Sequence, residues 1–253
     1  MNEPDATTRL QVYLAKRAVA SRRACADIIL SGRVYVDGER IIEPGFRIRS
    51  DMRVVLDGQE LAKMESAIRS IILYKPRGYI CSRKLQSTSR NLGTVYDLIE
   101  DIPEHLNTVG RLDKDSEGLI VLSNDGEFNE RLSHPRHGHS KTYLVTVTGH
   151  VSDDCLKRLN ACRQLESETI QPVAVSVQTH GKRTAVLKFV LHEGRNRQIR
   201  RMCKLYRLEI ATLVRTKIGA FEDHVLSPGD WRDLLPEDIA RLTQQHESKQ
   251  PLG

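Results

Sequence analysis

The chain has 253 residues, of which 39% are hydrophobic, 28% charged and 5% aromatic, with a formal net charge of +6. This length suits one large domain or a small domain followed by a medium one, and the composition is ordinary for a soluble globular protein. No apolar run reaches the roughly 20 residues that cross a bilayer, and the acidic first residues lack the apolar core of a signal peptide, so we expect a cytoplasmic protein.

The five cysteines are scattered along the chain: Cys25, Cys81, Cys155, Cys162 and Cys203. Their odd number and the lack of Cys-x-x-Cys spacing indicate reduced thiols rather than a disulfide framework or a zinc site. The positive net charge favours a polyanionic partner, and clustering of the basic residues would make that signal more specific.

Two helices and a hairpin are predicted in the N-terminal part, after a lead over residues 1–8 that we expect to be disordered. Apolar residues recur at helical spacing over residues 9–17. Ser21 is a good N-cap for a second helix, and Gly32 stands where that helix should end. Asp37-Gly38 lies between two short segments rich in β-branched residues, which predicts a β-hairpin.

This arrangement resembles the S4 RNA-binding module over residues 9–62. The positions that match it are Ser21-Arg22-Arg23, Gly32-Arg33-Val34 and Val36-Asp37-Gly38. Basic residues gather in its first half: Arg9, Lys16, Arg17, Arg22, Arg23 and Arg33. Such side chains suit phosphate oxygens, although a merely solvated helical face would look the same. No aromatic side chains interleave them as stacking platforms, which favours a structured stem-loop over single-stranded RNA.

The second domain is expected over residues 71–244, after a polar linker at 63–70. It begins with an apolar strand at 71–74, which runs into Lys75-Pro76-Arg77-Gly78, where proline fixes a turn beside a cation. A polar loop that we expect to be mobile follows at 85–91. A short helical turn is predicted at 95–99.

Asp113 lies in a polar loop that directly precedes the apolar run 119–122. The run reads as a buried strand, and residues 127–132 suit a short helix after it. Asp113 is therefore expected on an exposed loop held by a rigid strand, a usual place for catalytic groups. The alternative is an acidic turn that is simply solvated.

Three histidines follow at His134, His137 and His139. Their closeness suggests a metal site, but proline and glycine between them prevent a regular ligand face, and no cysteine or carboxylate cluster completes a set. We therefore expect no metal.

The remaining chain predicts a mainly β domain with flanking helices. Residues 141–149 form a strand with Tyr143 on the same face as two valines, where a tyrosine is more often a core residue than a site residue. A helix from Ser152 to Leu159 comes next, and strands at 171–178 and 184–192 precede a helix at 197–206. A strand at 209–213, a helix from Pro236 to Gln244 and a polar tail at 245–253 complete the chain.

The helix at 197–206 has an apolar face and a basic flank. Ile199, Met202, Cys203 and Tyr206 are spaced to be buried together. Arg197, Arg200 and Lys204 fall on the adjoining flank, from which a guanidinium could reach the edge of a cleft.

Residues 110–119 read Gly-Arg-Leu-Asp-Lys-Asp-Ser-Glu-Gly-Leu, which resembles the signature of the pseudouridine synthases, in the RsuA/RluF-type branch that modifies ribosomal RNA. Lys75-Pro76, Lys141-x-Tyr143, Gln198-Ile-Arg-Arg-Met202 and the segment 229–234 match further motifs in the family's order. The resemblance covers Arg9 to about Leu242. It implies an α+β fold in which a mixed, mainly antiparallel sheet is flanked by helices. It also implies an enzyme that isomerises a uridine of ribosomal RNA to pseudouridine without a cofactor.

The resemblance assigns the catalytic role to Asp113, with Tyr143 and Arg200 beside it. Tyr143 would stack on the detached base, and Arg200 would keep Asp113 ionised. Whether the carboxylate acts at C1′, at C6 of the base or on the C2′ proton stays open. The substrate pocket and RNA contacts would further include Leu213 as an apolar wall, Arg111 in the gap left by the extruded uridine, Arg197 and Lys75.

Two other functions stay open on the sequence. One is an S4-bearing ribosome assembly protein with an inert second domain. The other is a retaining glycosidase that pairs Asp113 with Asp115, which the scarcity of aromatic residues and the positive charge disfavour. For the enzyme, Asn196-Arg197 before Gln198 resembles the large-subunit members, so we expect an RluF-like monomer acting on 23S rRNA, with 16S rRNA as the alternative target.

Overall fold

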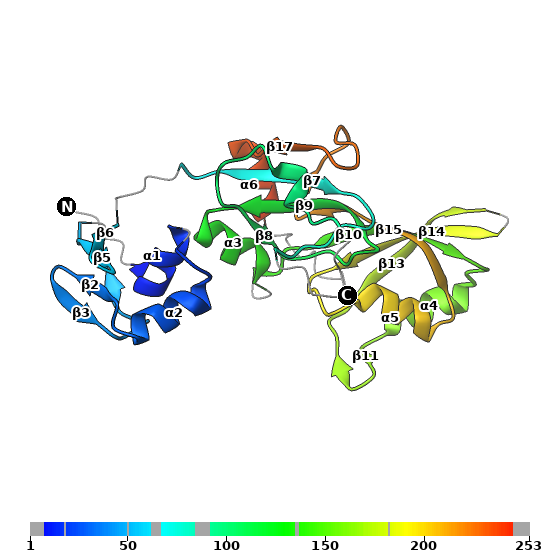
Figure 1. The fold of residues 1–253 in the computed structure, drawn as a ribbon. Helices are drawn as coiled ribbons and strands as arrows, with labels where there is room; N and C mark the ends of the chain where they lie inside the picture. The colour runs from blue at the N-terminus through cyan, green and yellow to red at the C-terminus, as the bar shows by residue number, and fades with distance from the viewer. Residues whose placement is uncertain are drawn as a thin grey trace. The chain divides into compact units, whose positions relative to one another are not determined.

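The computed structural model describes residues 8–17, 19–49, 51–61, 67–83, 92–134, 137–181 and 183–244. The chain divides into two compact units, residues 1–67 and 68–253 (Figure 1). The expected lead, the loop at 85–91 and the tail lie outside the described residues, except Thr8, which pairs with Ile48 in a short antiparallel ladder. Of the expected linker, Arg69 and Ser70 belong to the second unit, because Arg69 pairs with Asp233 and Ser70 opens a strand.

The first unit has two helices and two small sheets. Its elements are β1 (Thr8–Arg9), α1 (Leu10–Lys16), α2 (Arg22–Leu30), β2 (Val34–Val36), β3 (Glu39–Ile41), β4 (Arg47–Ile48), β5 (Val54–Leu56) and β6 (Gln59–Glu60). The four-stranded sheet has the order β3-β2-β5-β6, and β1 pairs with β4.

Local signals explain the predicted elements of this unit. The Ser21 hydroxyl accepts a hydrogen bond from the backbone N–H of Ala24 at 3.3 Å, which confirms the N-cap of α2. Asp37 and Gly38 both have positive φ, 49° and 88°, as a tight hairpin turn between β2 and β3 requires. Leu10 and Leu14 of α1 are fully buried against Cys25 and Ile29 of α2.

The second unit is built on one nine-stranded sheet. Its main strands are β7 (Ser70–Lys75), β8 (Asn107–Val109), β9 (Glu117–Ser123), β10 (Lys141–Thr148), β13 (Ala174–His180), β14 (Thr184–Leu191), β15 (Glu209–Ile218), β16 (Phe221–Glu222) and β17 (Trp231–Asp233). The order is β13-β14-β10-β15-β9-β7-β17, with β8 beside β9 and β16 beside β15. Among the named strands of the described residues, only β9 and β15 pair in parallel, so the predicted α+β fold with a mixed, mainly antiparallel sheet is confirmed.

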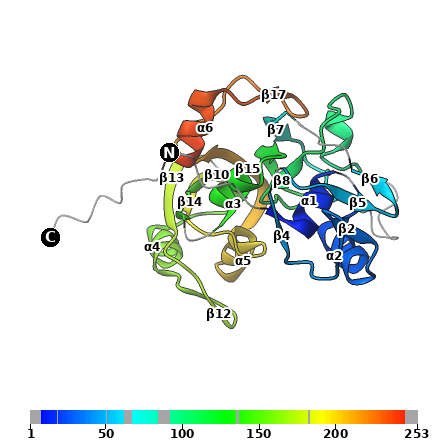
Figure 2. The same cartoon turned by 90° about the vertical axis from the view of Figure 1, so that its left-hand side faces the viewer.

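Helices flank this sheet: η1 (Asp97–Ile99), α3 (Gly126–Ser133), α4 (Asp153–Ala161), α5 (Gln198–Leu205) and α6 (Pro236–Thr243). A two-stranded hairpin of β11 (Gln164–Leu165) and β12 (Glu168–Thr169) lies between α4 and β13 in the chain. Figures 1 and 2 show α4 and α5 beside the β13–β14 part of the sheet. Leu159 of α4 and Met202 of α5 are fully buried in one core with Val145 and Phe189 of the sheet.

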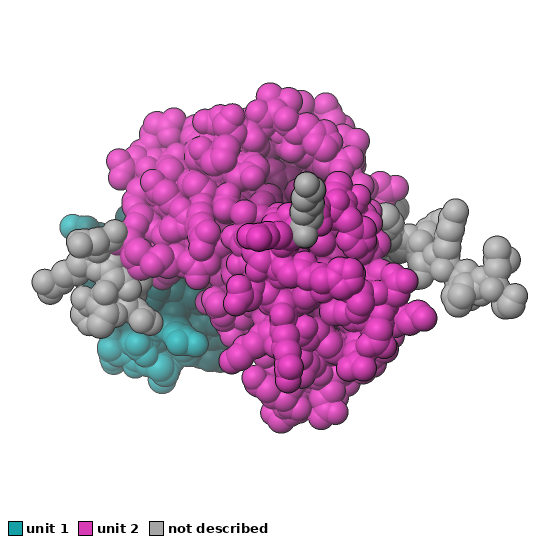
Figure 3. Space-filling model, turned by 90° about the vertical axis from the view of Figure 1, so that its right-hand side faces the viewer, with its two compact units in different colours: residues 1–67 teal, residues 68–253 magenta. Residues whose placement is uncertain are grey.

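The two faces of the sheet carry different cores. One core contains residues of α4 and α5, and another contains Leu73 and Ile120. Tyr143 packs against both cores, so both lie on the same face of the sheet. Neighbouring strand residues point to the opposite face, where Leu119 packs with Phe128 and other residues of α3 and α6. The larger unit that holds this sheet is magenta in Figure 3.

The sequence underestimated one strand. It predicted a strand at 209–213, but β15 runs to Ile218 because β10 offers pairing partners along its whole length. Within the described residues, no helix is long and apolar enough to span a bilayer.

Candidate active site

Lys75 holds the loop that carries Asp113 in place through hydrogen bonds to its backbone. The Lys75 side chain is fully buried, and its ammonium donates to the backbone carbonyls of Pro76 (2.9 Å), Lys114 (3.3 Å) and Ser116 (2.7 Å). Burial lowers the pKa of this amine, and nearby carboxylates partly oppose the shift. The sequence predicted Lys75 as an RNA contact. In the structure Lys75 lies at the end of β7, and its ammonium instead binds backbone carbonyls of the loop.

Cys81 fixes the same loop from the side. Its sulfur accepts a hydrogen bond from the N–H of Leu112 and donates to the Leu112 carbonyl, both at 3.4 Å. Burial raises the pKa of the Cys81 thiol. This role of Cys81 was not predictable from the sequence, because a lone cysteine has no spacing pattern.

Two arginines from the start of α5 reach Asp113. Arg200 Nε lies 3.6 Å and Arg197 Nη1 3.7 Å from Asp113 Oδ2, distances of ion pairs rather than hydrogen bonds. Arg200 Nη2 donates to the carbonyl of Asp115 at 2.8 Å and to the Ser116 hydroxyl at 3.2 Å. Burial and the neighbouring Arg197 lower the pKa of Arg200, while Asp113 opposes the shift.

Glu193 orders the segment that leads into α5. This buried carboxylate accepts hydrogen bonds from the N–H of Gln171 (2.8 Å), from Gln198 Nε2 (3.1 Å) and from Arg195 Nε (3.1 Å). Arg197 follows with a positive φ of 48° at the N-cap of the helix. The turn thus aims Arg197 and Arg200 to the same side, as their helical spacing predicted, whereas the part played by Glu193 was not predicted.

The predicted catalytic and pocket residues, Lys75 excepted, line one small cavity of about 100 Å³: Arg111, Asp113, Tyr143, Arg197, Arg200 and Leu213. It adjoins a larger cleft of about 490 Å³ that shares Arg111, Asp113, Tyr143 and Arg197. Asp113 has 29% of its side chain exposed, Leu213 is buried and Tyr143 is half-buried. The site therefore presents an accessible carboxylate between two cations and beside an aromatic ring.

The basic residues predicted for RNA docking lie in the first unit and have unequal surroundings. Arg9, Arg22 and Arg23 are exposed. Arg33 forms a bidentate ion pair with Asp57, and the Arg17 guanidinium lies 3.3 Å from the centre of the Tyr13 ring. The side chain of Lys16 lies outside the described residues.

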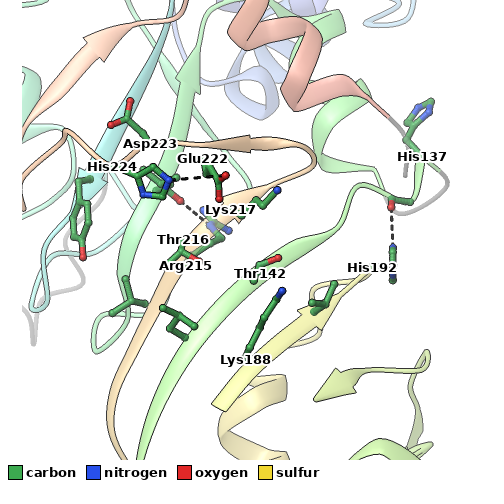
Figure 4. A pocket seen from close by; sticks show the side chains of 16 residues that line it. His137, Thr142, Lys188, His192, Arg215, Thr216, Lys217, Glu222, Asp223 and His224 are labelled. Carbon is green, nitrogen blue, oxygen red and sulfur yellow. Dashed lines mark hydrogen bonds and ion pairs between the residues drawn. The ribbon is translucent and has the colours of Figure 1, made fainter. Parts of the chain in front are cut away.

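A second cavity in the second unit is larger than the cleft at Asp113, at about 1030 Å³, and is lined by Lys188 and Thr142 (Figure 4). Their strand neighbours Leu187 and Tyr143 pack on the opposite face of the sheet, in the core of α4 and α5. Neither Asp113 nor Arg200 lines the larger cavity. The cleft of about 490 Å³, where Asp113, arginines and Tyr143 meet, is therefore the candidate active site.

The three histidines do not form a metal site in the described part of the chain. The rings of His137 and His139 stack with centroids 6.1 Å apart, and His137 Nε2 lies 3.6 Å from Glu130 Oε2. No group of three or more histidine, cysteine, aspartate or glutamate side chains among the described residues is arranged to hold a metal ion.

Known proteins share this organisation. Residues 69–205 match the family described as RNA pseudouridylate synthase, and residues 8–54 match the S4 domain. The chain is 33% identical over 236 residues to ribosomal large subunit pseudouridine synthase B of Bacillus subtilis, covering 92% of this chain and 95% of that one. It is 33% identical over 237 residues to ribosomal small subunit pseudouridine synthase A of Salmonella typhimurium, covering 92% and 99%. A crystal structure of a pseudouridylate synthase superposes with a TM-score of 0.66 at 27% identity, covering 92% of this chain and 99% of the other.

Proposed function

The chain belongs to the RNA pseudouridylate synthase family and is a pseudouridine synthase acting on RNA, and we propose that it modifies a uridine of 23S rRNA with Asp113 as the essential residue. One observation carries the proposal. Asp113 is accessible in a cleft, within 3.7 Å of two arginine nitrogens and lining the same cavity as Tyr143 and Leu213. We further propose that the enzyme acts as a monomer, which light scattering of the free protein tests.

The proposed reaction requires a carboxylate at the sugar and a surface that holds the detached base. The bond between N1 of the base and C1′ of the ribose breaks, the uracil turns and C5 bonds to C1′. C5 then loses its proton and N1 takes one up, so the product is an isomer of the substrate. An ionised carboxylate at the sugar serves as nucleophile, as stabiliser of charge at C1′ or as base at C2′, and we propose Asp113 for this position. Arg197 and Arg200 hold the carboxylate in place, because a nitrogen of each lies within 4 Å of Asp113 Oδ2.

Tyr143 and Leu213 suit the part of the cavity that would hold the base. Tyr143 packs against two hydrophobic cores, so its ring is fixed while one side faces the cavity. Leu213 is 4% exposed and lies opposite Val145 in the adjoining strand. We propose that a detached uracil stacks on Tyr143 beside this apolar wall and is thereby prevented from leaving.

The choice of 23S rRNA rests on Asn196-Arg197 before Gln198, a pair that resembles the large-subunit members. Relatives at 33% identity are named for both ribosomal subunits, so overall similarity does not select one. Pseudouridine mapping of rRNA from cells that lack this protein tests the target. We expect one or a few 23S positions to lose the modification, whereas loss confined to 16S rRNA would contradict the proposal.

The enzyme should need no metal. Dialysis against EDTA should leave pseudouridine formation unchanged, because the cleft has an acidic residue and basic residues but no ligand set among the described residues. The measurement is turnover before and after dialysis, with and without added zinc. Activity that disappears with EDTA and returns with zinc would instead implicate His134, His137 and His139.

The first unit should act mainly in docking. Arg22 and Arg23 are exposed in the first turn of α2 and have no ion-pair partner among the described residues. The double variant Arg22→Gln/Arg23→Gln should lower the slope of log K against log salt by about 1.8, from about 0.9 per phosphate contact on duplex-like RNA. Turnover at saturating RNA should stay close to that of the wild type.

The matched control for this variant is Lys157→Gln, which removes an exposed charge from α4 of the second unit. RNA titrations between 50 and 200 mM salt compare the three proteins. If the double variant keeps the slope and affinity of the wild type, the S4 unit is not the docking surface.

A further inference from the structure

Two cations lie together in the catalytic cleft without a carboxylate to balance them. Lys141 opens β10 and Arg215 lies on β15. Both line the 490 Å³ cleft that contains Asp113, and Arg215 also lines the 1030 Å³ cavity of Figure 4. Among the described residues neither side chain has an ion-pair partner, in contrast to Arg197 and Arg200, which share Asp113. Asp113 therefore balances the charges of Arg197 and Arg200, whereas Lys141 and Arg215 carry positive charge that no carboxylate balances within the described residues.

Arg215 is buried in a way that leaves part of its guanidinium unsatisfied. Its residue exposure is 4%, and its Nε donates to the carbonyl of Leu119 at 2.7 Å. The buried Nη2 has no hydrogen-bond partner within the described part of the chain. A buried charge without a partner is costly, so its presence beneath a cleft points to a ligand that supplies the missing negative charge.

Lys141 is half-buried and lies close enough to Arg215 for the two charges to repel each other. Burial, and then repulsion from Arg215, lower its pKa to about 8. His139 is also near Lys141, since burial and then the charge of Lys141 lower the pKa of this histidine. The cleft lining contains one carboxylate, Asp113, and six cations: Arg111, Lys114, Lys141, Arg195, Arg197 and Arg215.

We propose that Lys141, supported by the buried charge of Arg215, binds a backbone phosphate of the RNA beside the uridine that enters the cleft. The proposal rests on the pseudouridine synthase function and adds a subsite to it. Lys141 stands two residues before Tyr143 on the same face of β10, roughly 6.6 Å along the strand. A base stacked on Tyr143 would thus have its own or the adjoining phosphodiester within reach of the ammonium, which a bound anion would keep protonated.

The opposite face of the sheet provides a matched control. Lys188 of β14 is also half-buried and also lacks an ion-pair partner among the described residues, but it points into the cavity of Figure 4. A general effect of removing a lysine from the sheet should appear equally at both positions. A phosphate subsite should appear only at Lys141.

The experiment measures RNA binding and turnover of the full chain with 23S and 16S rRNA transcripts, for wild type, Lys141→Gln, Lys141→Arg and Lys188→Gln. Lys141→Gln should lower the slope of log K against log salt by about 0.9, the value for one phosphate contact. It should raise KM about tenfold while kcat stays within about threefold, since the contact serves binding. Lys141→Arg and Lys188→Gln should behave as the wild type.

A pH series separates this role from a structural one. The difference in salt slope between wild type and Lys141→Gln should be full at pH 7 and shrink by pH 9.5, because Lys141 loses its charge above a pKa of about 8. His139 is neutral across this range, since its pKa lies below the usual value, and the arginines stay charged.

Two outcomes overturn the proposal. One is a Lys141→Gln protein with unchanged salt slope and KM, including a protein in which only kcat falls. The other is a Lys141→Arg protein that loses as much binding as Lys141→Gln, because retained charge should rescue a phosphate contact. Should Lys141→Gln fail to fold, judged by its melting curve, the arginine variant decides alone. A wild type that forms no pseudouridine refutes the proposed function, and the salt slopes still test the subsite.

Discussion

Asp113→Asn should abolish pseudouridine formation while leaving RNA binding intact. The substitution keeps the shape of the side chain and removes the charge that lies 3.6 Å from Arg200 Nε and 3.7 Å from Arg197 Nη1. An amide neither attacks C1′ nor takes a proton at neutral pH, so every proposed route through this residue fails. RNA affinity should be equal or slightly higher, since a negative charge leaves a basic cleft.

The expected loss in turnover is at least ~10⁴-fold, about 5.5 kcal/mol in the barrier. Nucleoside analysis of digested RNA and release of hydrogen from C5 of uracil both measure it. Residual turnover within about tenfold of the wild type, a barrier change of only ~1.4 kcal/mol, would falsify the assignment of Asp113.

Asp115→Asn is the matched control in the same loop. Asp115 contributes its backbone carbonyl to Arg200, a contact that asparagine preserves, and its side chain does not line the catalytic cavity or the adjoining cleft. We expect this variant to keep turnover within about tenfold of the wild type. If both variants lost activity equally, the effect would belong to the charge or folding of the loop rather than to Asp113.

Gly118→Ala should severely destabilise the second unit. Gly118 lies where β9 pairs in parallel with β15, and its φ is +103°, a conformation that residues with a Cβ rarely adopt. A Cβ there would overlap the carbonyl oxygen of Arg215 and lie 2.7 Å from the Arg215 nitrogen. Both obstacles are backbone atoms of a central strand, so neither can turn aside as a side chain would.

The expected cost exceeds ~3 kcal/mol, combining strand separation with backbone strain, and a protein of ordinary stability would be partly unfolded. Chemical denaturation followed by circular dichroism measures the free energy of unfolding. The control is Gly110→Ala in the same loop region, where φ is also positive (+75°) but no atom would lie within 4 Å of the new Cβ. It should cost only ~1–2 kcal/mol. Equal costs for the two variants would show that strand contact at Gly118 is not the reason.

Elements with local causes were predictable from the sequence. The N-cap of α2 depends on Ser21 and the backbone three residues later, and the β2–β3 turn on the adjacent pair Asp37-Gly38. The buried strand β9 was predicted from four consecutive apolar residues before a polar turn. Such signals depend on neighbours within a few residues, so a single sequence contains them in full.

Elements without local causes escaped prediction. The short strands β1, β4, β6, β8, β16 and β17 exist because a partner strand offers hydrogen bonds, as when Trp231 pairs with Leu73. The last part of β15 is a similar case, since β10 extends it beyond Leu213. Pairing over long sequence separation leaves no periodic mark on the residues concerned.

For the catalytic site, the sequence supplied the residue types and the tertiary structure supplied their roles. Asp113 was identified by a motif, but its ion pair joins it to Arg200 across 87 positions of sequence, and only the approach of α5 to the β8–β9 loop creates that contact. Lys75 carried the same motif-based expectation of contacting RNA, and the fold buried it under the loop instead.

Lys141 and Arg215 show the same division in its sharpest form. Each is a basic residue in a strand; Lys141 entered the sequence analysis only as part of the Lys141-x-Tyr143 motif, without a role of its own, and Arg215 was not considered. The fold places β10 beside β15, buries Arg215, half-buries Lys141 and pairs neither with a carboxylate within the described residues. Sequence determines which charges a chain owns, whereas burial and the distance between charges decide what those charges do, because both are properties of the packed structure.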